Sequence, residues 1–250
     1  MMMTSNNRDN TMSKHLWNAM GRLKQEIYAV STLVEENLHK AVDAIETRNG
    51  ALAAAVIDSD TQIDLREVFI EEECLKTLAL FQPVATDLRF IVSVLKLNND
   101  LERIGDLAVN IADRALHLAK LPVPPGALEA FDFHDMAVQA QNMVKRSLDA
   151  LVDRDGRMAR RVTEADDQVD ALNRRHYQQV ESLIREQPEH LEVFLLLLSV
   201  SRQLERVADH ATNIAEDVIY MVEGNIIRHR KSSGQDSPDT TQHDETRTVT

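Results

Sequence analysis

Apolar residues recur every three or four positions along most of the chain. From Lys14 to about Arg48 they follow the alternating spacing that is typical of a helix packed in a bundle, at Leu16, Met20, Leu23, Ile27, Val30, Val34, Leu38, Ala41 and Ile45. The apolar pattern indicates further helices over residues 51–81 and 85–120, with breaks at Gly50 and Pro83. We therefore predict three long helices in the first half of the chain.

The second half of the chain repeats the first. The segment "LERIGDLAVNIAD" at 101–113 returns as "LERVADHATNIAE" at 204–216, and residues 34–64 align without a gap on residues 140–170. Self-similarity at a fixed period indicates a duplicated structural unit. We predict an all-α fold of two tandem three-helix bundles, with the second set of helices at 128–155, 157–186 and 188–222.

These patterns also predict how the chain is divided. A Pro-rich segment, "LPVPPGA", lies between the two copies and is the clearest linker, and the last residues have a polar composition without apolar period. The predicted units are a flexible N-terminus at 1–13, a first bundle at 14–120, a linker at 121–127, a second bundle at 128–224 and a disordered tail at 225–250.

Composition excludes several classes of partner. The formal net charge of −13 disfavours nucleic acid, whose phosphates need a basic surface, and disfavours docking on an anionic leaflet. The most apolar run, "VFLLLLSV" at 193–200, is far shorter than the roughly 20 residues that span a bilayer. A single cysteine, Cys74, cannot form an internal disulfide and suits a reducing compartment. We expect a soluble, cytoplasmic protein with no membrane insertion.

The repeated segment carries a stripe of oxygen-bearing side chains. On a helical wheel they fall within an arc of roughly 80°, at Glu102, Asp106, Asn110 and Asp113 in the first copy and at Glu205, Asp209, Asn213 and Glu216 in the second. This arc faces away from the main apolar stripe of each third helix. The second helix of each copy adds two acids spaced by four residues, Asp60 with Asp64 and Asp166 with Asp170.

Carboxylate and amide oxygens without a thiolate suit hard cations such as Mg²⁺, Mn²⁺, Ca²⁺ or iron. If the second and third helices of each copy pack side by side, their acids face a shared site. The alternative is a solvated acidic face, balanced by arginines such as Arg103 and Arg206. A third interpretation is a di-iron enzyme, but its Glu-x-x-His spacing occurs only at Glu36 and His39, without a counterpart in the second copy. A purely structural helical protein stays open as well.

Two segments, "QPVATDLRFIVSVLKLNNDLERIGDLAVNIA" (82–112) and "LERVADHATNIAEDVIYMVEG" (204–224), resemble the PhoU family of phosphate-transport accessory regulators. The resemblance extends from about Lys14 to Gly224. It implies a cytoplasmic, non-enzymatic protein of two three-helix bundles, commonly a homodimer, that restrains phosphate uptake and the phosphate-starvation response.

The resemblance also implies partners and metal-binding residues. The implied partners are the ATP-binding subunit of the ABC phosphate transporter and the sensor histidine kinase of the phosphate two-component system. The family's acidic motifs map onto Asp60, Asp64, Glu102, Asp106, Asp166, Asp170, Glu205 and Asp209, with no organic cofactor implied. One departure between the copies is Asp100, whose counterpart is Gln203, so the two sites are not expected to be identical.

Overall fold

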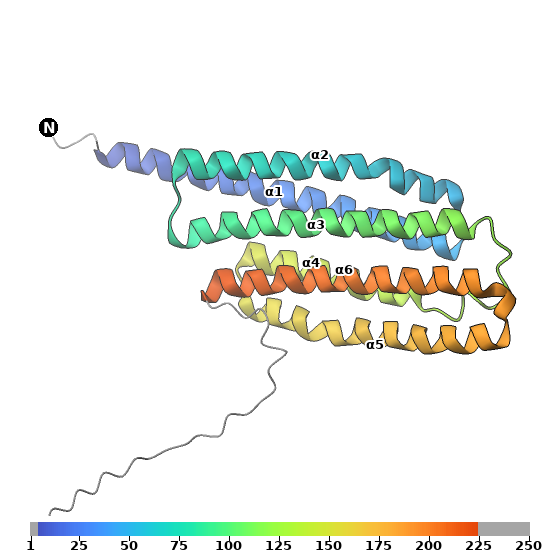
Figure 1. Cartoon of the computed structure of the whole chain (residues 1–250). Coiled ribbons are helices and arrows are strands. Elements are labelled where there is room, and N and C mark those ends of the chain that lie inside the picture. The colour runs from blue at the N-terminus through green and yellow to red at the C-terminus, as the bar shows by residue number, and fades with distance from the viewer. Residues whose placement is uncertain (1–4, 225–250) are drawn as a thin grey trace, which may run out of the picture.

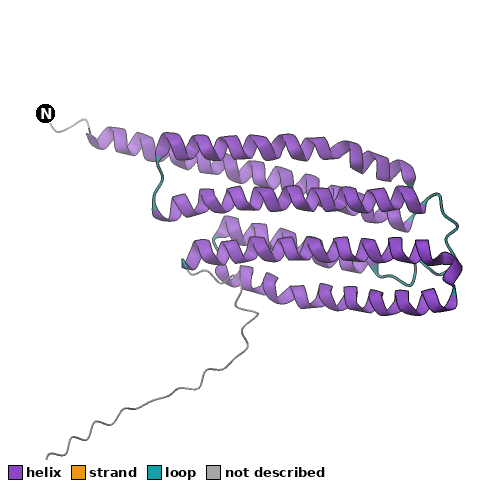
Figure 2. Ribbon diagram, viewed as in Figure 1, coloured by secondary structure: helices purple, strands orange, loops and turns teal. Residues whose placement is uncertain are grey.

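The structure, a computed structural model, describes residues 5–224, with side chains from Lys14 onward, so the predicted tail at 225–250 lies outside the described residues. Helices make up nearly all of this part and no strand occurs in it (Figure 2). They are α1 (Ser5–Glu46), α2 (Gly50–Phe81), α3 (Ala85–Leu118), α4 (Phe133–Asp153), α5 (Gly156–Glu186), the short 3₁₀ helix η1 (Pro188–His190) and α6 (Leu191–Glu223). The all-α prediction is confirmed. The first helix begins at Ser5, ahead of the predicted Lys14.

The break between the first two helices is built in the same way in both copies. Arg48 and Arg154 adopt the left-handed conformation, with φ of 53° and 54°. The next residue caps the following helix: the Asn49 side chain accepts hydrogen bonds from two backbone amides of α2, and the Asp155 side chain does the same for α5. Gly50, expected to make the first break, is instead the first residue of α2, and Gly156 is likewise the first residue of α5.

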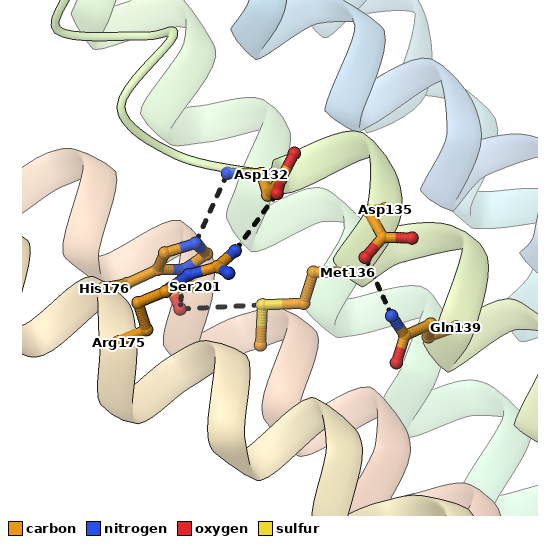
Figure 3. A network of polar contacts seen from close by, with 7 residues as sticks. All are labelled: Asp132, Asp135, Met136, Gln139, Arg175, His176 and Ser201. Carbon is orange, nitrogen blue, oxygen red and sulfur yellow. Dashed lines mark hydrogen bonds and ion pairs between the residues drawn. The ribbon is translucent and has the colours of Figure 1, made fainter.

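The connection between the copies is longer than predicted, because α4 begins at Phe133 and not at residue 128. Ala127 and Phe131 are buried although they lie in the loop, so their apolar character reflects packing and not helix. The loop is anchored to α5 at Asp132: its backbone N–H donates to His176 Nε2 over 3.3 Å, and its carboxylate lies 3.0 Å from Arg175 Nη2 (Figure 3).

The three helices of each copy pack against one another, and the copies then pack together along α3 and α6, with α1 contacting α4. In Figure 1, α3 and α6 lie side by side in the middle of the molecule, and α2 and α5 form its opposite outer edges. One continuous apolar core extends through both copies. The two bundles are therefore joined by an extensive helix–helix interface as well as by the linker.

Polar side chains cross the interface between α3 and α6. The imidazole Nδ1 of His210 lies 2.8 Å from Asp100 Oδ1, and Lys96 Nζ lies 3.2 Å from Asp217 Oδ1. The positions equivalent to Asp100 and His210 in the opposite copies are Gln203 and Leu107. The sequence departure at Asp100 therefore belongs to a contact between the copies. No helix in the described range 5–224 carries an apolar stretch that is long enough to cross a membrane.

Candidate functional site

The second and third helices of each copy meet along a seam that contains acids. On α2 the buried residues Val56, Ile63 and Ile70 face the core, and Asp60 and Glu67 fall between them at the same helical spacing. Gly105 of α3 faces this seam: a Cβ added there would lie 3.1 Å from Ile63 Cδ1 and 3.4 Å from Asp60 Oδ1. The absence of a side chain at Gly105 lets Asp60 lie directly against α3.

The acids of α2 and α3 lie near enough to raise one another's pKa. Partial burial raises the pKa of Asp60, and the negative charges of Asp64 and Asp106 raise it further. The pKa of Glu102 is also raised, first by burial and then by Asp106, Glu67 and Asp64, against a lowering effect of Arg103. We call this set of residues along the contact of α2 with α3, Asp60, Asp64, Glu67, Glu102 and Asp106, the first groove.

Glu67 is the member of the first groove that the sequence analysis missed. Burial raises its pKa, and the charges of Glu71 and Asp64 add to the effect. It lies two helical turns after Asp60 on the same seam. That seven-residue interval was the available signal, but only the packing of α2 on α3 shows that it points into the groove.

One carboxylate oxygen of the first groove lacks a hydrogen bond. Glu102 Oε2 is buried and receives none, although Arg103 Nε lies 3.5 Å away. Arg103 instead donates to Asp106 Oδ2 over 3.1 Å. A carboxylate oxygen that is removed from water without a hydrogen bond is costly, and a cation would offset that cost.

The second copy builds an equivalent second groove from Asp166, Asp170, Glu205 and Asp209. Burial raises the pKa of Glu205, followed by the charges of Asp209, Asp170 and Asp166, while Arg202 lowers it. The pKa of Asp209 is raised by desolvation and by Asp170, and lowered by His210 and Arg206. The eight acids predicted from the two copies therefore form two sets, one where α2 meets α3 and one where α5 meets α6, and members of each set raise one another's pKa.

The remaining four predicted positions lie outside these groups. Asn110 Oδ1 accepts a hydrogen bond of 3.3 Å from Arg114 Nη1, Asp113 and Asn213 are exposed, and Glu216 is half-buried. Neither Asp113 nor Glu216 is among the charged groups that raise the pKa of the groove acids, and Asn110 and Asn213 carry no charge. Metal binding by these four residues stays a prediction.

The grooves offer donors of the right chemistry without a preformed coordination shell. Across residues 14–224, no group of three or more His, Cys, Asp or Glu side chains stands in a position to hold a metal ion as it is. The donors are all oxygens, the ligand type that hard cations prefer. The chemistry of each groove fits a cation such as Mg²⁺, Mn²⁺, Ca²⁺ or iron.

Other reactive side chains lie elsewhere. Glu36 and His39 are exposed and pair locally, with Lys40 at 3.3 Å and with Asp43 at 3.5 Å. The Cys74 thiol is buried, and burial together with the nearby glutamates raises its pKa to about 12, so the protonated, unreactive form is favoured. Neither group forms part of a groove.

The chain is similar in sequence to one family of known proteins. The family model of the PhoU domain matches twice, at residues 27–115 and 133–218. The chain is 35% identical over 84% of its length to the phosphate-specific transport system accessory protein PhoU homolog 1 of Thermotoga maritima, covering 90% of that protein. It is 38% identical over 86% of its length to the homolog of Aquifex aeolicus, covering 96% of that protein.

Two solved structures are similar over most of their length. The crystal structure of PhoU from Pseudomonas aeruginosa matches with a TM-score of 0.78 at 36% identity, over 83% of this chain and 99% of that one. The phosphate transport system regulatory protein PhoU from Streptococcus pneumoniae matches with a TM-score of 0.75 at 27% identity, over 85% of this chain and 99% of that one. With two matched domains, a shared fold and this level of identity, the chain belongs to the PhoU family.

Proposed function

We propose that the chain is a cytoplasmic accessory protein of phosphate-specific transport that restrains phosphate uptake and the phosphate-starvation response when phosphate is plentiful. The single observation that carries the proposal is the pair of PhoU domains, with relatives named as accessory proteins of this transport system. It acts as an adaptor between the ATP-binding subunit of the transporter and the sensor histidine kinase, as a homodimer.

Two features support an adaptor in preference to an enzyme. The one cysteine carries a protonated, buried thiol, and the one fully buried histidine within residues 14–224, His176, is held by hydrogen bonds to Ser201 and to the loop between the copies. The relatives are named as accessory proteins, not as enzymes. The di-iron alternative has no support from Glu36 and His39, which are exposed and pair with their own helix.

Deletion of the chain tests this function. In phosphate-rich medium, the deletion strain should express phosphate-scavenging genes that the parent strain keeps silent, and expression of the intact chain should silence them again. Copurification then tests the linkage: the tagged chain should retain both the transporter ATP-binding subunit and the sensor kinase. Unchanged gene expression in the deletion strain would refute the regulatory role, and retention of neither partner would refute the adaptor mechanism alone.

We further propose that each groove binds one or more hard cations. Asp60, Asp64, Glu102 and Asp106 would hold the ion in the first groove, with Glu67 beside them, and Asp166, Asp170, Glu205 and Asp209 would hold it in the second. A bound cation would neutralise the clustered carboxylates and link α2 to α3, and α5 to α6. The buried Glu102 Oε2 that receives no hydrogen bond and the raised pKa values of acids on facing helices support this proposal.

A further inference from the structure

The outer face of α2 exposes large apolar side chains. Leu65 is 68% exposed, Val68 51%, Phe69 46%, Leu75 54% and Leu80 60%. On the helical wheel these side chains project from the half of α2 opposite its buried stripe, so α2 carries large apolar side chains on both sides. In Figure 1, α2 forms an outer edge of the molecule, with α1 and α3 on its inner side.

The second copy shows that the fold does not require this surface. The buried residues of α5 align with those of α2, as at Val169 with Ile63 and at Val180 with Cys74. Under that alignment the positions of Leu65, Val68, Phe69 and Leu75 are occupied by Ala171, Arg174, Arg175 and Glu181. At three of these four positions the outer face of α5 is therefore charged where that of α2 is apolar. Exposed apolar patches of this kind mark interaction sites.

The spacing on α2 favours a helix as the occupant. The outward positions Thr61, Leu65, Val68, Glu72, Leu75 and Ala79 alternate in steps of four and three. This is the spacing by which one helix packs along another. We call these six residues the outer seam. Glu72, an exposed carboxylate, lies in the middle of it.

Charge decides which kind of helix fits the outer seam. No ion pair is formed by Asp58, Glu71 or Glu72 with any residue in the described range, and Lys76, the nearby cation, already lies 2.8 Å from Glu73 Oε1. A partner that covers the seam must therefore bring basic side chains, one of them close to Glu72, or leave acids desolvated without a counter-charge. A second copy would bring the same acids on a chain of net charge −13, and an anionic membrane would also repel them.

From these observations we infer that the outer seam of α2 binds an amphipathic helix of another protein, one whose apolar stripe is flanked by Lys or Arg with a basic residue opposite Glu72. This inference rests on the surface of α2 alone. It holds whether or not the chain regulates phosphate transport, and it does not involve the acids of the grooves.

Site-specific photocrosslinking in cells tests the surface directly. The crosslinking residue p-benzoylphenylalanine is placed at Leu65 or Leu75, and at the equivalent α5 positions Ala171 or Glu181 as matched controls. The α2 positions should yield an adduct with another protein, in a segment that projects as a basic amphipathic helix, and the α5 positions should not. Adducts with a second copy only, adducts at all four positions, or no adduct would each overturn the inference.

A synthetic peptide of the crosslinked segment then tests the contacts. Val68→Arg combined with Leu75→Glu gives α2 the residues that α5 carries, and it should weaken peptide binding by at least about tenfold. The matched α5 variant, Arg174→Val with Glu181→Leu, should leave the affinity unchanged. Both variants alter exposed positions and should melt at the temperature of the unmodified chain.

The charge on the seam has its own test. Glu72→Lys should weaken peptide binding, and replacing the facing basic residue of the peptide by Glu should restore it. Equal binding of the original peptide to the Glu72→Lys variant would remove the electrostatic part of the inference. Binding of the chain to vesicles rich in phosphatidylglycerol, lost in the Val68→Arg and Leu75→Glu variant, would assign the seam to a membrane and overturn it.

Discussion

The two copies share one helical framework and differ in what they place on it. Along the seam that faces the third helix, the first copy has Glu67 and Ile70, where the second has Asn173 and His176. Asn173 does not join the second groove: its Oδ1 accepts a hydrogen bond of 2.9 Å from Ser201. The first copy therefore carries one more carboxylate in its groove, and the second carries a buried hydrogen-bond network that secures the linker.

Where the second and third helices approach closely, the two copies carry different residues but the same total side-chain volume. Gly105 of the first copy faces Ile63, whereas the equivalent pair in the second copy is Ala208 and Val169. In the second copy Ala208 adds a methyl group on the third helix, and Val169 on the second helix is one methylene group smaller than Ile63. Close-packed interiors tolerate such compensated exchanges far better than single changes of volume. Duplication thus leaves each copy free to change the chemistry of its surfaces while the helix–helix spacing is retained.

The largest effect on stability is expected from His176→Ile, which places in the second copy the residue that the first copy has at Ile70. The imidazole accepts from Asp132 N–H, lies 2.8 Å from Ser201 Oγ through Nδ1 and packs beside the Phe131 and Phe133 rings. Its loss removes the acceptor of the Asp132 amide, the contact with Ser201 and the ring contacts of a fully buried side chain, at a cost of about 3 kcal/mol in the free energy of unfolding. Denaturant unfolding measures it, with the exposed His134→Ile as control. Equal stability of the two variants would contradict the role assigned to the network.

The same histidine predicts a pH dependence that the first copy lacks. Burial lowers the pKa of His176 from 6.5 to about 4, so the folded state favours the neutral ring. Its contribution to stability is present above pH 6.5 and is lost as the pH falls from there toward 4. Between pH 7 and pH 5 the unmodified chain should lose about 2 kcal/mol more than the His176→Ile variant. Parallel stability curves for the two proteins would show that His176 does not titrate as proposed.

A smaller effect is expected where the copies exchange volume. Gly105→Ala alone forces its Cβ against Ile63, and Ile63→Val alone removes a buried methylene group. Together they reproduce the pair of the second copy, so the double variant should be more stable than the sum of the single changes by about 1 kcal/mol. A double-mutant cycle in urea measures this coupling. Strict additivity would mean that the contact between Gly105 and Ile63 does not set the spacing of α2 and α3.

The smallest effect is expected from neutralising one groove acid. The raised pKa of Asp60 means that its charged form is disfavoured in the folded state, a penalty that is present above its folded pKa. In the presence of a chelator at neutral pH, Asp60→Asn should therefore stabilise the chain by a few tenths of a kcal/mol. Asp58→Asn, outside the groove on the same helix, should have no such effect. Destabilisation by Asp60→Asn in metal-free protein would contradict the electrostatic description of the groove.

The helices and the duplication could be predicted from the sequence pattern. The apolar periods gave the six long helices, and the repeated segments gave the duplication and the eight groove acids, because helical spacing alone places those residues on one face. The predicted start of α4 was wrong. Phe131 is buried because it contacts Phe133 and His176, and not because it lies in a helix. Local pattern cannot distinguish those two causes of burial.

The contacts within the site could not be predicted from the sequence, because they depend on how distant segments pack. Glu67 enters the groove only because α2 lies against α3, and the contact between Asp100 and His210 joins residues from different copies. The copies differ at Glu67 and at Asp100. Aligning the copies therefore shows only that these residues depart from the repeat, and not what they contact. The helical wheel also places Asp113 and Asn213 on this face, and their part in metal binding stays a prediction.

Metal content measured beside thermal stability tests the central claim, that both grooves bind hard cations. The chain and two variants, Glu102→Ala with Asp106→Ala and Glu205→Ala with Asp209→Ala, are equilibrated with Mg²⁺, Mn²⁺, Ca²⁺ or iron, separated from free ion and subjected to elemental analysis and melting. The account predicts that each variant retains about half of the metal, and that chelation lowers the melting temperature of the unmodified chain until metal is restored. A chain that retains none of these ions and melts at the same temperature with and without chelator would contradict the account and leave the grooves as solvated acidic faces.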